Sequence, residues 1–157
     1  MECKYHYVNN LKEYEDKHFA EAIILSCIDY RFIDGTIFFL EQNPLLSQKY
    51  DVTALAGASL AVNQTKYPHW RQTFIDQVSL AIKLHHIKQL IVFDHMDCGA
   101  YQQFYPDLES NSDAERQLHI KNIYIFINNL KKIFPNLIYS GYLIHNDNSV
   151  EVIINNF

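Results

Sequence analysis

Short apolar runs of strand length alternate along this chain with longer segments of helical periodicity, and this alternation restricts the possible folds most. The clearest runs, 22–27 and 89–93, show no helical spacing, which is typical of strands covered on both faces. Strands that alternate with helices form βαβ units, in which the strands pair in parallel and the crossovers are right-handed. The sequence therefore predicts a single α/β domain over residues 1–157, with a central, mostly parallel sheet in the order 2-1-3-4 flanked by helices.

Apolar spacing and turn residues predict the remaining elements. The other predicted strands are 51–55, 137–144 and 150–154, of which the last returns after a tight turn as an antiparallel fifth strand at the edge. The predicted helices are 35–40, 68–85 and about 112–134. Residues 1–20 are predicted to form an amino-terminal helical arm, and the polar stretch 101–111, which contains Pro106, is predicted to be a loop.

Composition and charge exclude several classes of protein. With 157 residues and a formal net charge of −5, the chain lacks the basic face that a nucleic-acid partner demands. No apolar stretch approaches the roughly 20 residues needed to span a bilayer, and the first residues lack the basic start and apolar run of a secretory signal. A cytoplasmic protein without nucleic-acid or membrane partners is expected.

The three cysteines cannot form a disulfide framework, which directs attention to metal binding. In a reducing compartment, a cysteine with a function is usually a metal ligand or a nucleophile, and otherwise it is a small buried hydrophobe. Cys3, near the start of the chain, is expected to be such a small hydrophobe. Cys27 closes the first predicted strand, whereas His95 and Cys98 follow directly on the third.

The predicted strand order brings these residues together. In an order 2-1-3-4 the first and third strands are neighbours, and their carboxyl ends flank the point where such sheets bind ligands. Cys27, His95 and Cys98 should therefore converge although they lie far apart in sequence. Two thiolates and an imidazole supply three corners of a zinc tetrahedron, with the fourth left for water or a carboxylate. Because thiolates are soft ligands that disfavour magnesium and calcium, the predicted cofactor is one Zn²⁺ ion.

A charged pair follows the first of these ligands. Two-residue steps in extended chain place Asp29 and Arg31 on the same side as Cys27. An arginine beside an aspartate forms a bidentate pair that keeps the carboxylate ionised. Next to zinc, that carboxylate could orient bound water, help to move its proton, or become the fourth ligand. The alternative is a purely structural ion pair at the end of a strand.

Taken in order, the motifs Cys-x-Asp-x-Arg, an Ala-Gly turn and His-x-Asp-Cys-Gly-Ala resemble the signature of the β-class carbonic anhydrases. The resemblance covers residues 22–101. It implies a parallel α/β fold, zinc held by Cys27, His95 and Cys98, and a catalytic dyad of Asp29 and Arg31. The implied reaction is reversible hydration of carbon dioxide to bicarbonate, in which zinc activates its bound water as hydroxide and the dyad orients it.

Further residues are expected to contribute to this site. Ala56, Gly57 and Gly99 are expected to line the pocket or to support the ligands. The family often has an arginine where Ala54 stands, and usually a glycine where Asp94 stands. Asp94 is expected either to hydrogen-bond the imidazole of His95 or to face solvent. The family also implies a homodimer or a higher homo-oligomer, in which a partner subunit completes the pocket.

Three other functions remain open. The protein is either an active anhydrase or a zinc-binding relative that has lost turnover, which the changes at Ala54 and Asp94 permit. A hydrolase of carbonyl sulfide or carbon disulfide is a further alternative, and a thiol redox enzyme is the most distant one, because the chain lacks a Cys-x-x-Cys motif. His119, in the long predicted helix, is expected at the surface or at an interface.

Overall fold

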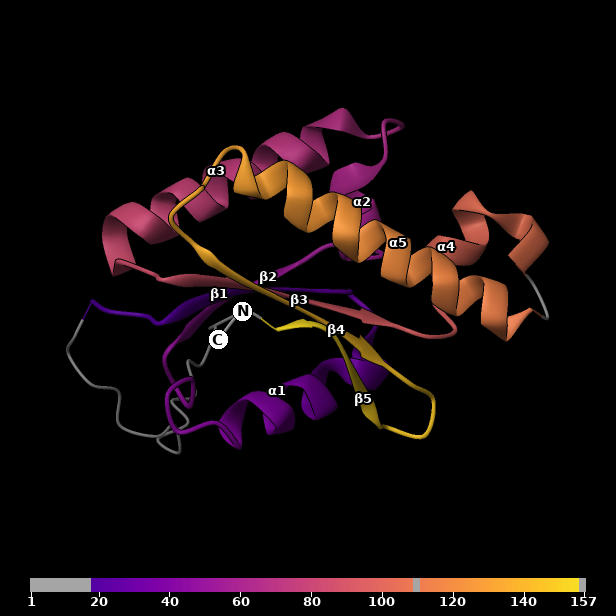
Figure 1. Cartoon of the computed structure of the whole chain (residues 1–157), viewed down its shortest axis with the longest axis horizontal. Coiled ribbons are helices and arrows are strands. Elements are labelled where there is room, and N and C mark those ends of the chain that lie inside the picture. Colours follow the sequence, from indigo (N-terminus) through magenta and orange to yellow (C-terminus); the bar gives the residue numbers. More distant parts are fainter. Residues whose placement is uncertain (1–17, 109–110, 156–157) are drawn as a thin grey trace, which may run out of the picture.

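The computed structural model describes residues 18–108 and 111–155, and these form one α/β domain around a five-stranded sheet (Figure 1). The strands are β1 (Ala22–Ser26), β2 (Tyr50–Ala54), β3 (Gln89–His95), β4 (Ile138–Ile144) and β5 (Val150–Asn155). They lie in the order β2-β1-β3-β4-β5, and all neighbours are parallel except β4 and β5. The predicted strand order and its antiparallel fifth edge strand are therefore confirmed.

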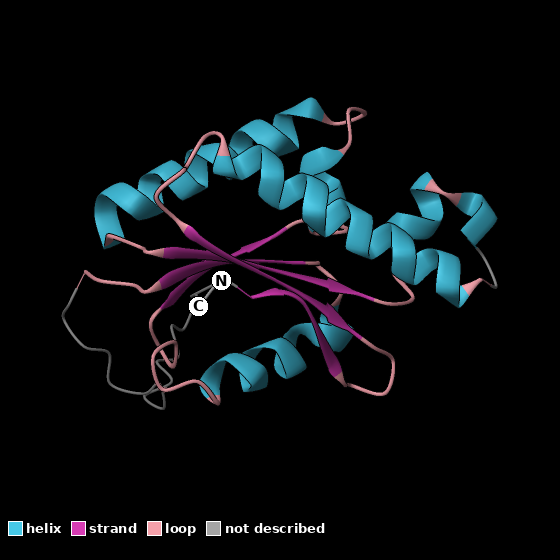
Figure 2. Cartoon of the chain, in the orientation of Figure 1, coloured by secondary structure: helices cyan, strands magenta, loops and turns pink. Residues whose placement is uncertain are grey.

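Helices cover both faces of the sheet, as Figure 2 shows. The α-helices are α1 (Ile33–Glu41), α2 (Ser59–Asn63), α3 (Pro68–His85), α4 (Gly99–Phe104) and α5 (Ser112–Lys131), with 3₁₀ turns η1 (Tyr30–Phe32) and η2 (Pro106–Leu108). One face carries α1, and the opposite face carries α2, α3 and α5 (Figure 1). The predicted helical arm falls mostly on residues 1–17, outside the described residues, and 18–20 contain no helix.

The prediction of a loop over residues 101–111 is wrong, because α4 and η2 occupy most of it. Gln102 and Gln103 are exposed and make the segment look polar, whereas Tyr101 on the inner side of α4 is fully buried. Pro106 opens η2, and proline is tolerated at a first helical position because the N–H there needs no helical partner. A single buried aromatic residue in a helix of six residues gives too weak a periodic signal to predict.

Alternation of side chains along the strands builds the two halves of the core. All seven residues of β3 are buried. Leu90 and Val92 pack on the side of α3 and α5, while Ile91 and Phe93 pack on the side of α1. A strand covered on both faces is apolar at successive positions, which explains why its sequence lacks a polar face.

At Gly141 in β4 the sheet leaves no room for a side chain beneath α5. A Cβ added there would lie 2.5 Å from Cγ2 of Ile123 and 3.4 Å from Cδ1 of Ile127. We expect Gly141→Ala to lower the free energy of unfolding by about 1–3 kcal/mol, because the helix must move outward. Urea denaturation measures the change. Gly35→Ala in α1 is the matched control, since a Cβ there meets nothing within 4 Å and should stabilise the helix slightly. Equal losses in both variants would contradict this packing account.

Among the described residues, no helix combines the length and the apolar character that crossing a membrane requires.

Candidate metal centre

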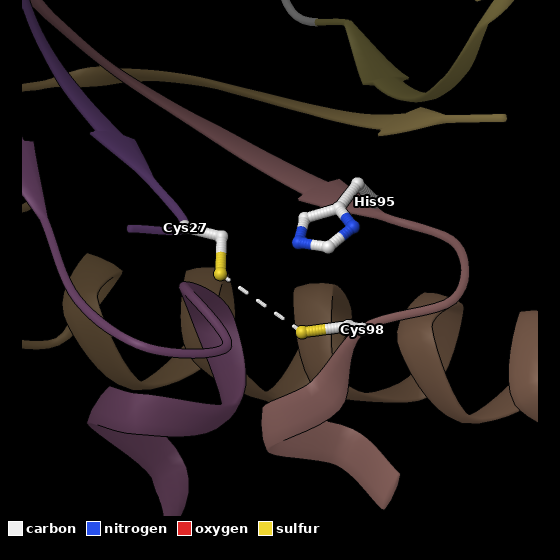
Figure 3. A group of neighbouring side chains, drawn as sticks. All are labelled: Cys27, His95 and Cys98. Atoms are coloured by element: carbon white, nitrogen blue, oxygen red, sulfur yellow. Dashed lines mark hydrogen bonds between the residues drawn. The ribbon is translucent and has the colours of Figure 1, made fainter. Parts of the chain in front are cut away.

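Two neighbouring strand ends bring the predicted ligands together. Cys27 directly follows β1, His95 closes β3, and Cys98 is the residue before α4. Since β1 and β3 pair in parallel, with Ser26 opposite Phe93, both chains leave the sheet at the same edge. The ligand atoms of Cys27, His95 and Cys98 all lie within 4.8 Å of one another, and the two sulfurs are 3.9 Å apart (Figure 3). This buried group could hold a metal ion.

The imidazole of His95 is held in place by two contacts. Its Nδ1 lies 2.9 Å from the backbone carbonyl oxygen of Met96, to which it can donate as N–H. The ring also stacks on Phe32, with the two ring centroids 4.2 Å apart. The other nitrogen, Nε2, is buried and has no hydrogen-bond partner among the described residues. A buried imidazole nitrogen that lacks a partner and lies beside two sulfurs fits a soft cation such as zinc.

The two thiols share one proton between them. The pKa of Cys27 is lowered to about 4, because Cys98 donates a hydrogen bond to its sulfur; burial opposes this, and His95 and the Gly57 N–H assist. The Gly57 N–H donates to Sγ of Cys27 over 3.3 Å. The pKa of Cys98 is raised, because it keeps its proton in the bond to Cys27 and is itself buried. A metal that binds both sulfurs as thiolates must therefore displace the proton of their hydrogen bond.

We expect zinc binding to the metal-free protein to release about one proton, from the Cys27 and Cys98 pair, at neutral pH. Titration calorimetry in buffers of different ionisation enthalpy measures that number directly. A Cys98→Ser variant should lose most of the affinity for zinc, because it removes one of the two sulfur ligands. Zinc binding that released no proton would contradict the protonation of this thiol pair.

The predicted charged pair lies at the edge of the cluster. Nη2 of Arg31 donates to Oδ2 of Asp29 over 2.7 Å, and Nε donates to Oδ1 over 3.0 Å. The backbone N–H of Arg31 also donates to Asp29, which thereby caps η1. These bonds lower the pKa of Asp29 to about 2, against the opposing effect of burial. Oδ2 of Asp29 lies 3.9 Å from Nε2 of His95. The structure therefore brings an ionised carboxylate to the open side of the candidate metal centre.

A pocket of about 750 Å³ opens beside the cluster. Ala56 and Gly99, two of the expected positions, line it together with the dyad and the aromatic side chains of Tyr67, Trp70 and Phe104. Gly57 instead supports a ligand through its N–H. It adopts a φ of +84°, and a Cβ there would lie 3.2 Å from that of Ala100. Glycine is required at this turn both by its backbone conformation and by the close approach of α4.

Both expectations for Asp94 are wrong, because it neither bonds the imidazole of His95 nor faces solvent. It is 2% exposed, and its carboxylate accepts hydrogen bonds from the N–H and hydroxyl of Ser59 and from the hydroxyl of Tyr101, over 3.0, 2.7 and 2.7 Å. Adjacent residues of a strand point to opposite faces, so Asp94 turns toward the helices when His95 turns toward the metal cluster.

The expectation of a surface or interface position for His119 is also wrong. Its side chain is fully buried between two carboxylates, with Nδ1 3.0 Å from Asp94 and Nε2 3.6 Å from Glu115. Although burial works in the opposite direction, these carboxylates raise the pKa of His119. Glu115 in turn accepts a hydrogen bond from the backbone N–H of Cys98 over 3.1 Å. A buried polar chain thus connects Asp94 to the backbone of a candidate ligand.

Sequence reasoning missed Glu115 and His119 as supports of the site. They stand four residues apart and therefore share one face of α5. That spacing was the available signal, but charged pairs at this spacing usually lie on the solvated face of a helix. Only the placement of α5 over the carboxyl ends of the strands reveals that this pair is internal.

One family model matches most of the chain, and two bacterial proteins are similar to it in sequence. The sequence model of the family described as "Putative carbonic anhydrase" matches residues 15–154. An uncharacterized protein of Rickettsia bellii is 34% identical over 135 residues, which are 85% of this chain and 82% of that protein. An uncharacterized protein of Rickettsia conorii is 33% identical over 135 residues, which are 85% of this chain and 72% of that protein.

Solved structures show a similar fold at low sequence identity. The β-carbonic anhydrase CafA of Aspergillus fumigatus has a TM-score of 0.56 and 13% identity. The match covers 88% of this chain and 78% of CafA. One of two tetrameric β-carbonic anhydrases of Sordaria macrospora has a TM-score of 0.57 and 12% identity. The match covers 87% of this chain and 81% of that enzyme. The β-carbonic anhydrase CcaA has a TM-score of 0.56 and 14% identity. The match covers 90% of this chain and 80% of CcaA.

Proposed function

The chain belongs to the carbonic anhydrase family whose model matches residues 15–154, and from that premise we propose that it is a zinc enzyme that hydrates carbon dioxide reversibly to bicarbonate. The observation that carries the proposal is the convergence of two sulfurs and one unpartnered imidazole nitrogen at the carboxyl ends of β1 and β3. The β-carbonic anhydrases that share this fold support the same interpretation.

Cys27, His95 and Cys98 would hold the metal, and the donor set matches zinc. Bound there, zinc would supply the Lewis-acid chemistry that lowers the pKa of water enough for it to act as a nucleophile. Two thiolates offset the charge of the ion, so we expect activity to favour alkaline pH. The protein supports this arrangement through Gly57, which bonds the sulfur of Cys27, and through Met96, whose carbonyl orients the imidazole.

Asp29 and Arg31 have separate tasks in this mechanism. The carboxylate of Asp29 would accept a hydrogen bond from the reacting water and so fix the direction of its lone pair. Arg31 keeps that carboxylate ionised and in place through its bidentate bonds. The aromatic and apolar wall of the pocket, including Ala56, Trp70 and Phe104, suits a small apolar substrate such as carbon dioxide.

The proposal includes a homodimer or a higher homo-oligomer. The Sordaria macrospora enzymes are described as tetrameric. In this chain, Ile28 and Tyr30 line the pocket and are 60% and 82% exposed. Large apolar side chains of this exposure around a functional pocket favour a protein surface that covers them. Light scattering of the purified protein measures the assembly directly.

Metal analysis followed by stopped-flow carbon dioxide hydration on the same sample tests the proposed function. We expect one zinc per chain and turnover that rises toward alkaline pH. Cys27→Ser should abolish both. Stoichiometric zinc without hydration would overturn the proposed activity and leave a zinc-binding relative, and such a sample would next be assayed with carbonyl sulfide and carbon disulfide.

A further inference from the structure

Asp97 binds the guanidinium of Arg31 along the edge next to the one that Asp29 occupies. Nη1 of Arg31 donates to Oδ2 of Asp97 over 2.8 Å, and Nη2 donates to the backbone carbonyl oxygen of Asp97 over 2.9 Å. The remaining oxygen, Oδ1, accepts a hydrogen bond from Gln102 in α4 over 3.1 Å. One arginine therefore joins the segment after β1 to the turn that carries Cys98.

The backbone of this turn is fixed from its inner side as well. Asp97 has a φ of +56°, in the left-handed region that residues with a Cβ adopt at a cost. In that conformation its carbonyl faces outward to Arg31, while the next N–H, that of Cys98, donates to the buried carboxylate of Glu115. The turn is thus tied to α5 on one side and to Arg31 on the other.

Exposure explains why a second anchor for Arg31 matters. The side chains of Arg31 and Asp29 are 42% and 18% exposed. An ion pair open to water holds its partners only weakly, because solvent screens the attraction and the long arginine side chain loses entropy when it is fixed. Asp97, itself 49% exposed at its side chain, adds a carboxylate and a carbonyl to the same guanidinium. Asp29 and Asp97 together raise the pKa of Arg31, and the bond from Arg31 lowers that of Asp97.

We propose that Asp97 is a positioning residue, which holds the guanidinium of Arg31 and through it keeps the carboxylate of Asp29 turned toward the Cys27, His95 and Cys98 cluster. Four of the five guanidinium N–H groups then serve the two aspartates. The catalytic consequence rests on the proposed function, whereas the immobilisation of Arg31 does not.

Three variants separate the side chain of Asp97 from its unusual backbone. Asp97→Gly keeps the positive φ without strain and keeps the backbone carbonyl, but it removes the carboxylate. Asp97→Asn keeps both a residue suited to that conformation and an acceptor oxygen. Asn148→Gly is the matched control, since Asn148 is exposed in the turn between β4 and β5 and has a φ of +64°.

The first readout is the mobility of Arg31, measured by ¹⁵N NMR of its Nε–H group, which Arg31→Lys assigns. We expect a protected, immobile Nε–H in wild type, in Asp97→Asn and in Asn148→Gly. In Asp97→Gly the signal should exchange with water or show fast motion. An equally immobile Arg31 in Asp97→Gly would overturn the proposal, whatever the activity.

The second readout is carbon dioxide hydration in a double-mutant cycle. We expect Asp97→Gly to lower kcat by about 10- to 100-fold with zinc content and Tm retained, and Asp97→Asn to recover most of it. In an Asp29→Asn background, Asp97→Gly should cost less than about twofold, because its effect acts through Asp29. If Asp97→Gly lowered kcat in the Asp29→Asn background by as much as it does in wild type, the positioning role would be overturned. If wild type itself does not hydrate carbon dioxide, the proposed function fails, and the NMR result alone decides the role of Asp97.

Discussion

Asp29→Asn is expected to lower carbon dioxide hydration by about 100-fold or more while zinc remains bound. Asparagine preserves the size of the side chain and can still accept a bond from Arg31. It lacks the charge that accepts and orients a hydrogen bond from the reacting water. Stopped-flow assays with parallel metal analysis measure both quantities. Asp76→Asn, at an exposed position of α3 that Gln72 bonds, is the matched control and should behave as wild type.

The lowered pKa of Asp29 adds a prediction of its pH behaviour. A carboxylate with a pKa of about 2 is ionised throughout the neutral and mildly acidic range. Loss of activity between pH 8 and 5 should therefore not come from protonation of Asp29, but from the reacting water. Undiminished turnover in Asp29→Asn with zinc bound would remove Asp29 from the mechanism.

Asp94→Ala is expected to lower the free energy of unfolding by about 3–5 kcal/mol, the largest effect on stability that we predict. The fully buried side chain of Asp94 accepts bonds from Ser59, Tyr101 and His119. Alanine would leave those donors unsatisfied and the imidazole of His119 without its nearer carboxylate. Urea denaturation of wild type and variant measures the difference.

Two further variants keep this prediction testable if Asp94→Ala does not fold. Asp94→Asn retains the shape and loses the charge, and we expect a smaller loss. Ser59→Ala removes one neutral donor and should cost about 1 kcal/mol. Losses of the same small size in Ser59→Ala and Asp94→Ala would contradict the account of Asp94 as the centre of the buried polar chain.

The sequence predicted the parts of this protein that depend on chain order and periodicity. An apolar run without helical spacing is enough to identify β3. Because parallel strands end at one edge, Cys27 and His95 could be placed together from the strand order alone. Asp29 and Arg31 were expected beside Cys27 from the two-residue steps of an extended chain. Their side chains do lie beside the cluster, but that expectation of extended chain is wrong, because Asp29 caps the 3₁₀ turn η1 that contains Arg31.

The features that were missed depend on which way a side chain turns. Asp94 and His95 are adjacent, and one residue of register decides which of them faces the metal cluster. The sequence of α5 predicts a surface position for His119, because the helix is rich in polar residues. Its burial depends on how α5 packs against the sheet, which the helix sequence does not show. Asp97 lies between two candidate metal ligands. Its neighbours in sequence do not predict its positive φ, the conformation in which its carbonyl accepts a bond from Arg31.

X-ray absorption at the zinc edge of the zinc-loaded protein tests the central claim most directly. Coordination by Cys27, His95 and Cys98 predicts two sulfur ligands at about 2.3 Å and one nitrogen ligand at about 2.0 Å, with a light atom in the fourth position. Cys27→Ser should remove one sulfur from that shell. A zinc shell made only of oxygen and nitrogen would contradict the claim that these strand ends form the metal centre.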